Sequence, residues 1–126
     1  CHPQLAGRIW RMTITVNTLL KRRDGMSKAD FIAYYEAHHR LIGEKVLRGY
    51  ATRYVRRFLH PTDGTDTHED PDVVMEIDFP DEATRGACFA AMGDEAVMAE
   101  IVADEEKLFD RARIRTFTLE KRESIL

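Results

Sequence analysis

The sequence predicts an α+β fold in which helices cover one face of a four-stranded antiparallel sheet. Three observations lead to this prediction. Four stretches alternate apolar and polar side chains, or are rich in β-branched and aromatic residues, as strands are. Helical regions with typical N-cap residues follow the first and the third of these stretches. A chain of 126 residues is long enough for one such domain with a single core.

The first strand and the first helix have the clearest boundaries. Residues 12–20 alternate apolar and polar side chains, which predicts a half-buried strand. Gly25 suits a turn that needs a positive φ, and Ser27 is a typical N-cap residue. We therefore expect a helix over about residues 27–46, which Gly49 ends.

On a wheel of about 100° per residue, the predicted helix has one apolar and one polar arc. Both histidines fall on the apolar side, His38 near its centre and His39 nearer its edge. An imidazole titrates near neutral pH, so a histidine on this side can act as a general base. It can equally be a core histidine with one hydrogen-bonded nitrogen. The apolar arc also contains Phe31, Ile32, Tyr34, Tyr35, Leu41, Ile42 and Val46.

The rest of the chain completes the order β-α-β-β-α-β. Residues 60–71 are rich in Pro, Gly, Asp and Thr and have no apolar anchor, which predicts a mobile connection. Asp81 is a typical N-cap for the helix that follows Pro80. This order is that of the ferredoxin-like split βαβ fold. The predicted elements are strands at 51–59, 72–79 and 113–119 and helices at 82–92 and 94–110.

Composition excludes several classes of function. A net charge of −3 and a pI near 6.0 argue against nucleic-acid binding, which usually needs a basic surplus. No apolar run approaches the roughly 18 residues that span a membrane, so we expect no membrane partner. The two cysteines, Cys1 and Cys88, suggest no disulfide framework, which favours a reducing, cytoplasmic setting. Residues 1–11 lack the apolar core of a signal peptide, and we expect an N-terminal extension or a cloning remnant.

The stretch LLKRRDGMSKADFIAYYEAHHRLIGEKV, residues 19–46, closely resembles the EthD domain family. The family pattern F-x-x-Y-W-x-x-x-H falls on Phe31, Tyr34, Tyr35 and His39, with Tyr35 where Trp is usual. The stretch VADEEKLFD is similar to the second helical signature of the family, and its marked positions are Asp104, Glu105 and Phe109. The resemblance covers nearly all of residues 12–122, which leaves 123–126 as a C-terminal tail.

The resemblance implies a dimeric α/β barrel, in which the sheets of two ferredoxin-like chains join. We therefore expect a homodimer. The wider superfamily includes lactone isomerases, aromatic polyketide cyclases and cofactor-free monooxygenases, and fungal relatives act as dehydratases or decarboxylases in polyketide pathways. Because one fold can serve many reactions, the resemblance alone does not decide the function.

These observations favour a cofactor-free lyase or isomerase, dehydratase- or cyclase-like, that acts on a small hydrophobic cyclic, aromatic or polyketide-type substrate. His39 would abstract a proton next to a carbonyl, and Tyr35, one turn earlier, would hydrogen-bond the enolate oxygen. Asp104 would hold the imidazole tautomer. These three form the predicted catalytic set. The predicted substrate-binding side chains are Tyr34, Phe31, His38 and Phe89.

Other interpretations remain open at this stage. The aromatic residues can be core filling. The chain can also be a non-catalytic, small-molecule-binding EthD protein of a degradation pathway, or a cofactor-independent monooxygenase whose substrate itself activates oxygen. Glu36 and His39 form a single E-x-x-H pair, whereas a di-iron site needs two such pairs and two further carboxylates. We therefore expect no metal and no cofactor. Cys88, beside Phe89 in a predicted helix, is typical of a small buried residue and not of a nucleophile.

Overall fold

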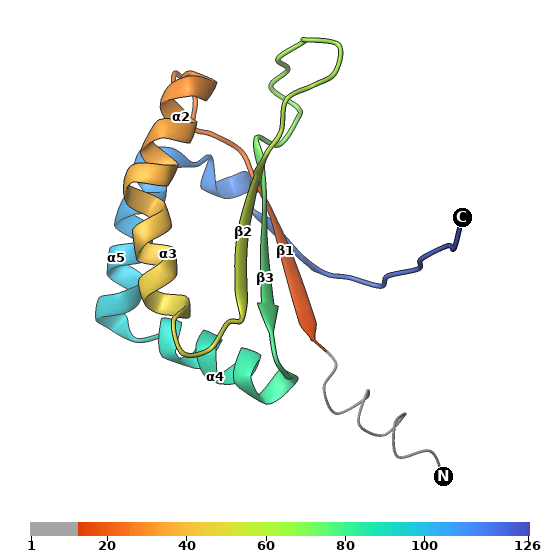
Figure 1. Cartoon of the computed structure of the whole chain (residues 1–126). Coiled ribbons are helices and arrows are strands. Elements are labelled where there is room, and N and C mark those ends of the chain that lie inside the picture. Colours follow the sequence, from red (N-terminus) through yellow and green to blue (C-terminus); the bar gives the residue numbers. More distant parts are fainter. Residues whose placement is uncertain (1–12) are drawn as a thin grey trace.

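The computed structural model describes residues 13–126, whose strands form one antiparallel sheet in the order β2-β3-β1-β4. The central strands are β1 (Ile14–Leu20) and β3 (Val73–Phe79), and the edge strands are β2 (Arg53–Phe58) and β4 (Arg115–Thr118). The helices lie on one face of this sheet (Figure 1). The predicted ferredoxin-like α+β fold is therefore confirmed. The predicted extension at residues 1–11 lies outside the described residues.

The predicted helices are present, with one change in winding. Residues 28–47 form one helical body in three segments: α2 (Lys28–Tyr34), a π-helical turn (Tyr35–His39) and α3 (Arg40–Leu47). The remaining helical segments are α4 (Glu82–Met92), α5 (Glu95–Leu108) and a 3₁₀ turn (Arg111–Arg113) before β4. The Ser27 hydroxyl accepts a hydrogen bond from the Asp30 N–H at 3.1 Å, and Asp81 caps α4 in the same way at 2.7 Å from the Thr84 N–H. Both predicted N-caps are confirmed.

Strand register directs alternate side chains toward the helices. Ile77 of β3 pairs with Val16 on one side and with Tyr54 on the other, so these three residues share the helix-facing side. Two clusters of buried side chains fill the space beneath the helices. The first core contains Leu20, Phe31, Tyr35, Val73, Leu108 and Phe109, and the second core contains Val16, Leu47, Ile77, Phe79 and Cys88.

Polar contacts anchor the long connection between β2 and β3, which lies beyond the end of the sheet beside the start of α2 (Figure 1). Asp72, 1% exposed, ends this connection and lies 3.3 Å from the Lys21 ammonium and 3.6 Å from that of Lys28. Lys21 also donates to the Thr67 carbonyl at 3.2 Å, and Arg22 pairs with Asp66 at 2.5 Å. Charged side chains thus hold this connection in place, although its sequence has no apolar anchor.

The face of the sheet opposite the helices is polar and charged near β2 and β3. Glu76 lies 3.2 Å from both Arg53 and Arg57, and Arg53 also lies 3.3 Å from Asp78. The aromatic ring of Phe117 is 40% exposed. No helix among the described residues has the length and apolar character needed to cross a membrane.

Candidate active site

The helix that carries both histidines is π-helical at Tyr35–His39, and this turn decides which histidine is buried. The side chains of Phe31, Tyr35, His39 and Leu47 all face the interior, at spacings of four or eight residues. In a regular α-helix, each step of four residues rotates a side chain by about 40° away from its starting side. A π turn contains more residues per turn, so each residue rotates less and the side chains return toward the starting side. His39 therefore stays above the first core.

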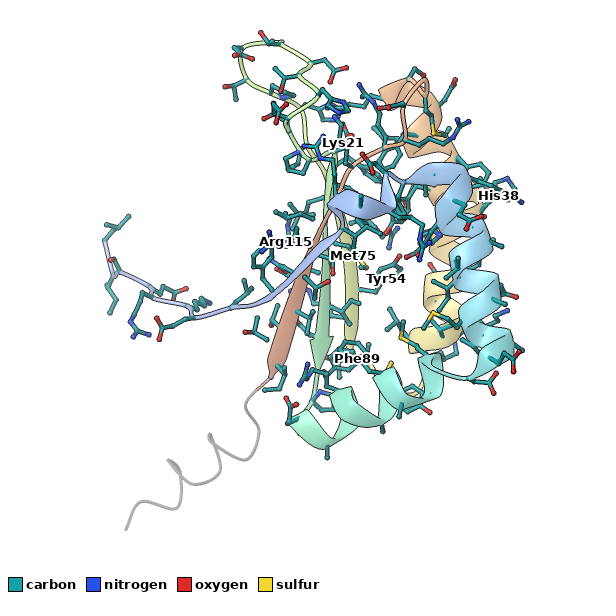
Figure 2. The ribbon with its side chains drawn as sticks, turned by 180° about the vertical axis from the view of Figure 1, so that it is seen from behind. Lys21, His38, Tyr54, Met75, Phe89 and Arg115 are labelled. Carbon is teal, nitrogen blue, oxygen red and sulfur yellow. The ribbon has the colours of Figure 1, made fainter. Side chains whose placement is uncertain are left out.

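The prediction that His38 lies near the centre of the apolar side is wrong. His38 is exposed, and Figure 2 shows it on the side of the helix away from the sheet. Its ring packs against that of Tyr34, with 4.7 Å between the centroids. The wheel failed because it assumed a uniform rotation per residue through the π turn.

The imidazole of His39 is paired with the carboxylate of Asp104, which belongs to α5. Nδ1 of His39 lies 2.8 Å from Oδ2 of Asp104, and the two side chains are only 12% and 10% exposed. The rings of Tyr35 and Phe109 meet the imidazole edge to face, each with centroids 5.1 Å away. An ionised carboxylate only accepts hydrogen bonds, so Nδ1 carries a proton, and in the neutral form of the imidazole Nε2 carries the free lone pair.

Nε2 of His39 is free to act as an acceptor. Within residues 13–126 it makes no hydrogen bond, yet it is not among the fully buried polar atoms that lack a partner. It therefore reaches accessible space. A neutral imidazole with one nitrogen anchored and the other free has the form of a general base with its orienting carboxylate.

Tyr34 contacts the same carboxylate from the other side. Its hydroxyl donates to Oδ1 of Asp104 at 2.5 Å. This hydrogen bond, with burial and the carboxylate charge, raises the pKa of Tyr34 to about 12, so the phenol stays protonated near neutral pH. Predicted from the sequence as a wall of the substrate pocket, Tyr34 instead joins His39 and Asp104 in one hydrogen-bonded group.

Tyr35 is a core residue in this structure, and its hydroxyl faces Tyr54 of β2. The two phenolic oxygens are 3.2 Å apart, and the Tyr35 side chain has no exposed surface. Burial raises the pKa of Tyr35 well above its ordinary value, and the neighbouring Tyr54 hydroxyl raises it further. Figure 2 shows Tyr54 and Met75 on the helix-facing side of the sheet. Tyr54 was not singled out from the sequence, because nothing local in strand β2 distinguishes it.

The two predicted phenylalanines lie in different places. Phe31 is fully buried and meets the rings of Tyr35, Phe58 and Phe109 edge to face, as expected of core filling. Phe89 of α4 packs against Phe79 of the second core, at the other end of the sheet from His38 (Figure 2). The structure thus brings together His39, Asp104, Tyr34 and Tyr35 and does not bring Phe89 to them.

Metal binding and nucleophilic catalysis have little support in the described residues. Among residues 13–126, no group of three or more His, Cys, Asp or Glu side chains is arranged to hold a metal ion. Both carboxylate oxygens of Glu36 are engaged by Arg56, at 2.8 and 3.0 Å. Cys88 is fully buried, and burial raises the pKa of its thiol.

A surface hollow of about 440 Å³ lies between α3 and α5 and reaches Asp104. Leu41, Ile42 and Ala103 form its apolar part, and Lys45 and Lys107 lie among its lining residues. His39 is not part of this lining, so the hollow reaches the pair only at the carboxylate. The volume is in the range of pockets that hold small molecules.

Comparison with known proteins places these residues in a family. The EthD domain matches residues 23–112, a span that includes the histidine helix and Asp104. No curated protein matches the sequence. The matched region starts after β1 and ends just before β4. These two strands are therefore assigned from the structure and not from the family match.

Several solved structures share the fold at low sequence identity. An ethyl tert-butyl ether D (EthD) family protein from Bacillus halodurans is 14% identical, with a TM-score of 0.62 over 88% of this chain and 100% of that one. A dimeric ferredoxin-like protein of unknown function from Thermobifida fusca is 13% identical, with a TM-score of 0.58 over 86% and 90%. A dimeric protein of unknown function from Bacteroides fragilis, also ferredoxin-like, is 8% identical, with a TM-score of 0.56 over 86% and 96%.

Proposed function

This chain belongs to the EthD domain family, and we propose that it is a cofactor-free lyase or isomerase that moves protons on a small, largely hydrophobic molecule. The observation that carries the proposal is the 2.8 Å contact between Nδ1 of His39 and Asp104 in a mostly buried setting. An anchored Nδ1 and a free Nε2 give the imidazole one defined task, which is to take a proton from a bound molecule.

The proposed reaction begins when Nε2 of His39 removes a proton from a carbon next to a carbonyl group. The electron pair of the broken C–H bond forms an enolate, and the imidazole becomes an imidazolium that the Asp104 carboxylate stabilises. In a dehydratase, the imidazolium then protonates a β-hydroxyl group, which leaves as water while the enolate collapses to a conjugated double bond. In an isomerase, the same proton returns to a different carbon. Both reactions use only protein side chains and need no external oxidant.

The role of Tyr35 in this proposal is to support the imidazole. Its ring meets that of His39 edge to face, and its hydroxyl is held by Tyr54. Together with Phe109, it fixes the plane of the imidazole and keeps water from one side of it. Stabilisation of an enolate oxygen by the Tyr35 hydroxyl, expected from the sequence, would require the Tyr54 contact to open.

Deuterium exchange in D₂O tests the first step of the proposed reaction, whichever product is formed afterwards. Small cyclic ketones, β-hydroxy ketones and aromatic polyketide-type molecules are incubated with the protein, and loss of the proton α to the carbonyl is followed by NMR. We expect faster exchange for at least one class. His39→Ala should lower that rate by roughly 100-fold or more, since general base catalysis typically contributes this much.

His38→Ala is a matched control, because it removes a neighbouring imidazole that faces the solvent. Its exchange rate should stay within about twofold of the unmodified protein. Equal losses in both variants, or no exchange with any class of ketone, would argue against general base catalysis by His39.

A non-catalytic binding protein is the second candidate, and the hollow between α3 and α5 favours it. Its lining includes Asp104 but not His39, so a molecule there would approach the carboxylate side of the pair. A ligand found by titration that binds equally well to the protein and to His39→Ala, with no α-proton exchange, would support this function instead.

We further propose that two chains pair through the sheet face opposite the helices. Two structures with the same fold are described as dimeric. On this face, the Phe117 ring is 40% exposed, and Oδ1 of Asn17 is buried without a hydrogen-bond donor among the described residues. A second copy would cover the ring and bring donors to this amide, because Arg53 and Arg57 lie on the same face.

A further inference from the structure

Asp104 receives two hydrogen bonds, one on each oxygen, from residues five positions apart on one helix. His39 binds Oδ2 at 2.8 Å, and Tyr34 binds Oδ1 at 2.5 Å. In a regular α-helix, two residues separated by five positions point about 140° apart. The π turn at Tyr35–His39 lies between them and brings both side chains to the same carboxylate.

We propose that Tyr34 is a positioning residue for His39 and acts through Asp104. A carboxylate held at one oxygen only can rotate about its terminal bond and exchange its two oxygens. With Oδ1 held by the phenol, Oδ2 faces Nδ1 of His39 continuously, and the imidazole keeps one orientation. The inference deepens the proposed function, because the residue it adds serves the same base.

In both hydrogen bonds to Asp104, the carboxylate is the acceptor. The phenol can satisfy Asp104 only as a donor while the carboxylate is ionised, and the same holds for Nδ1 of His39. Both protons therefore point at the carboxylate, and Nε2 remains the acceptor.

Proton NMR of the whole chain tests the role of Tyr34 independently of turnover. The Nδ1 proton of His39 should give a downfield signal that exchanges slowly with water, because both its donor and its acceptor are held. In Tyr34→Phe we expect that exchange to become roughly tenfold faster, as expected for the loss of one hydrogen bond to a charged group. Where a ketone substrate has been found, kcat should fall by a similar factor while KM stays unchanged, since the phenol does not touch the substrate.

Tyr50→Phe is the matched control, because Tyr50 packs against the second core and its hydroxyl is not one of the partners of Asp104. It should leave the Nδ1 signal unchanged. An unchanged signal in a folded Tyr34→Phe protein would overturn the positioning role. Faster exchange in Tyr34→Phe with no ketone turned over by the unmodified protein would instead support the positioning role and refute the proposed enzyme activity.

Discussion

The hydroxyl of Tyr54 lies only 2.7 Å from the point where a β-carbon on Gly43 would be. Gly43 is in α3, and the missing side chain lets the Tyr54 phenol reach under the helix to Tyr35. Alanine favours a helix over glycine by about 1 kcal/mol, but here its methyl group would collide with the half-buried Tyr54 ring. We expect Gly43→Ala to destabilise the protein by roughly 1–2 kcal/mol in urea denaturation, since overpacking outweighs the helical preference.

Gly86→Ala is the control for this effect, because a β-carbon at Gly86 in α4 meets nothing within 4 Å. It should raise the free energy of unfolding by roughly 0.5–1 kcal/mol. Adding Tyr54→Phe to Gly43→Ala should recover part of the loss, because the closest atom is then gone. A stabilising Gly43→Ala would show that the ring moves aside easily.

The contribution of Tyr34 to stability should disappear at high pH. Its pKa is raised to about 12 in the folded protein, above the ordinary value near 10. The folded state thus favours the protonated phenol, so the contribution is complete below pH 10 and is lost as the pH rises toward 12. The difference in unfolding free energy between the protein and Tyr34→Phe, about 1 kcal/mol at pH 8, should shrink by pH 11. A difference that grows with pH would contradict this sign.

Asp72 should be the most sensitive carboxylate of the β2–β3 connection. It is 1% exposed and lies within 4 Å of Lys21 and Lys28, so its removal leaves a buried ammonium group without a counter-charge. We expect Asp72→Ala to cost about 3–5 kcal/mol in thermal or urea denaturation. The control is Asp66→Ala, whose side chain is 53% exposed and should contribute less than about 1 kcal/mol. Similar small losses in both variants would show that Lys21 finds another partner.

The proposed dimer can be tested at Phe117. Phe117→Glu places a charge on the face that a second copy would cover, whereas Phe89→Glu changes an equally exposed ring on the helix side. Sedimentation equilibrium should give twice the 14.6 kDa of one chain for the protein and for Phe89→Glu. Phe117→Glu should shift the mass toward a single chain, because burying an unpaired charge is unfavourable. A dimer in both variants would locate the interface elsewhere.

The fold could be predicted from the sequence because each element carried its own local signal. Alternation marked the central strands, and Ser27 and Asp81 marked two helix starts that the structure confirms. Predicted and observed boundaries differ where the local signals are weak. The last strand, predicted from residue 113, begins at Arg115, because residues 111–113 form a 3₁₀ turn. The pairing of His39 with Asp104 was also expected, on the basis of the family resemblance, and the 2.8 Å distance agrees with it.

The parts of the site that were missed depend on contacts between distant segments or on the π turn. Tyr34 was interpreted as a pocket wall, because nothing near it in sequence shows that α5 brings a carboxylate to its hydroxyl. His38 was placed inside by a uniform rotation that the helix does not follow. Tyr54 is recognisable only through the space that Gly43 leaves for it, and the two are eleven residues apart in separate elements.

The change of winding at Tyr35–His39 also separates the two cores. Phe31 and Tyr35, up to the start of the turn, belong to the first core, and Leu47, beyond it, belongs to the second. Because the turn offsets the rotation of the α-helical segments on either side, His39 and Leu47 both face the interior although they are eight residues apart. One helix thus serves both cores, and Tyr54, which packs against the second core, joins it to the first through its hydroxyl contact with Tyr35.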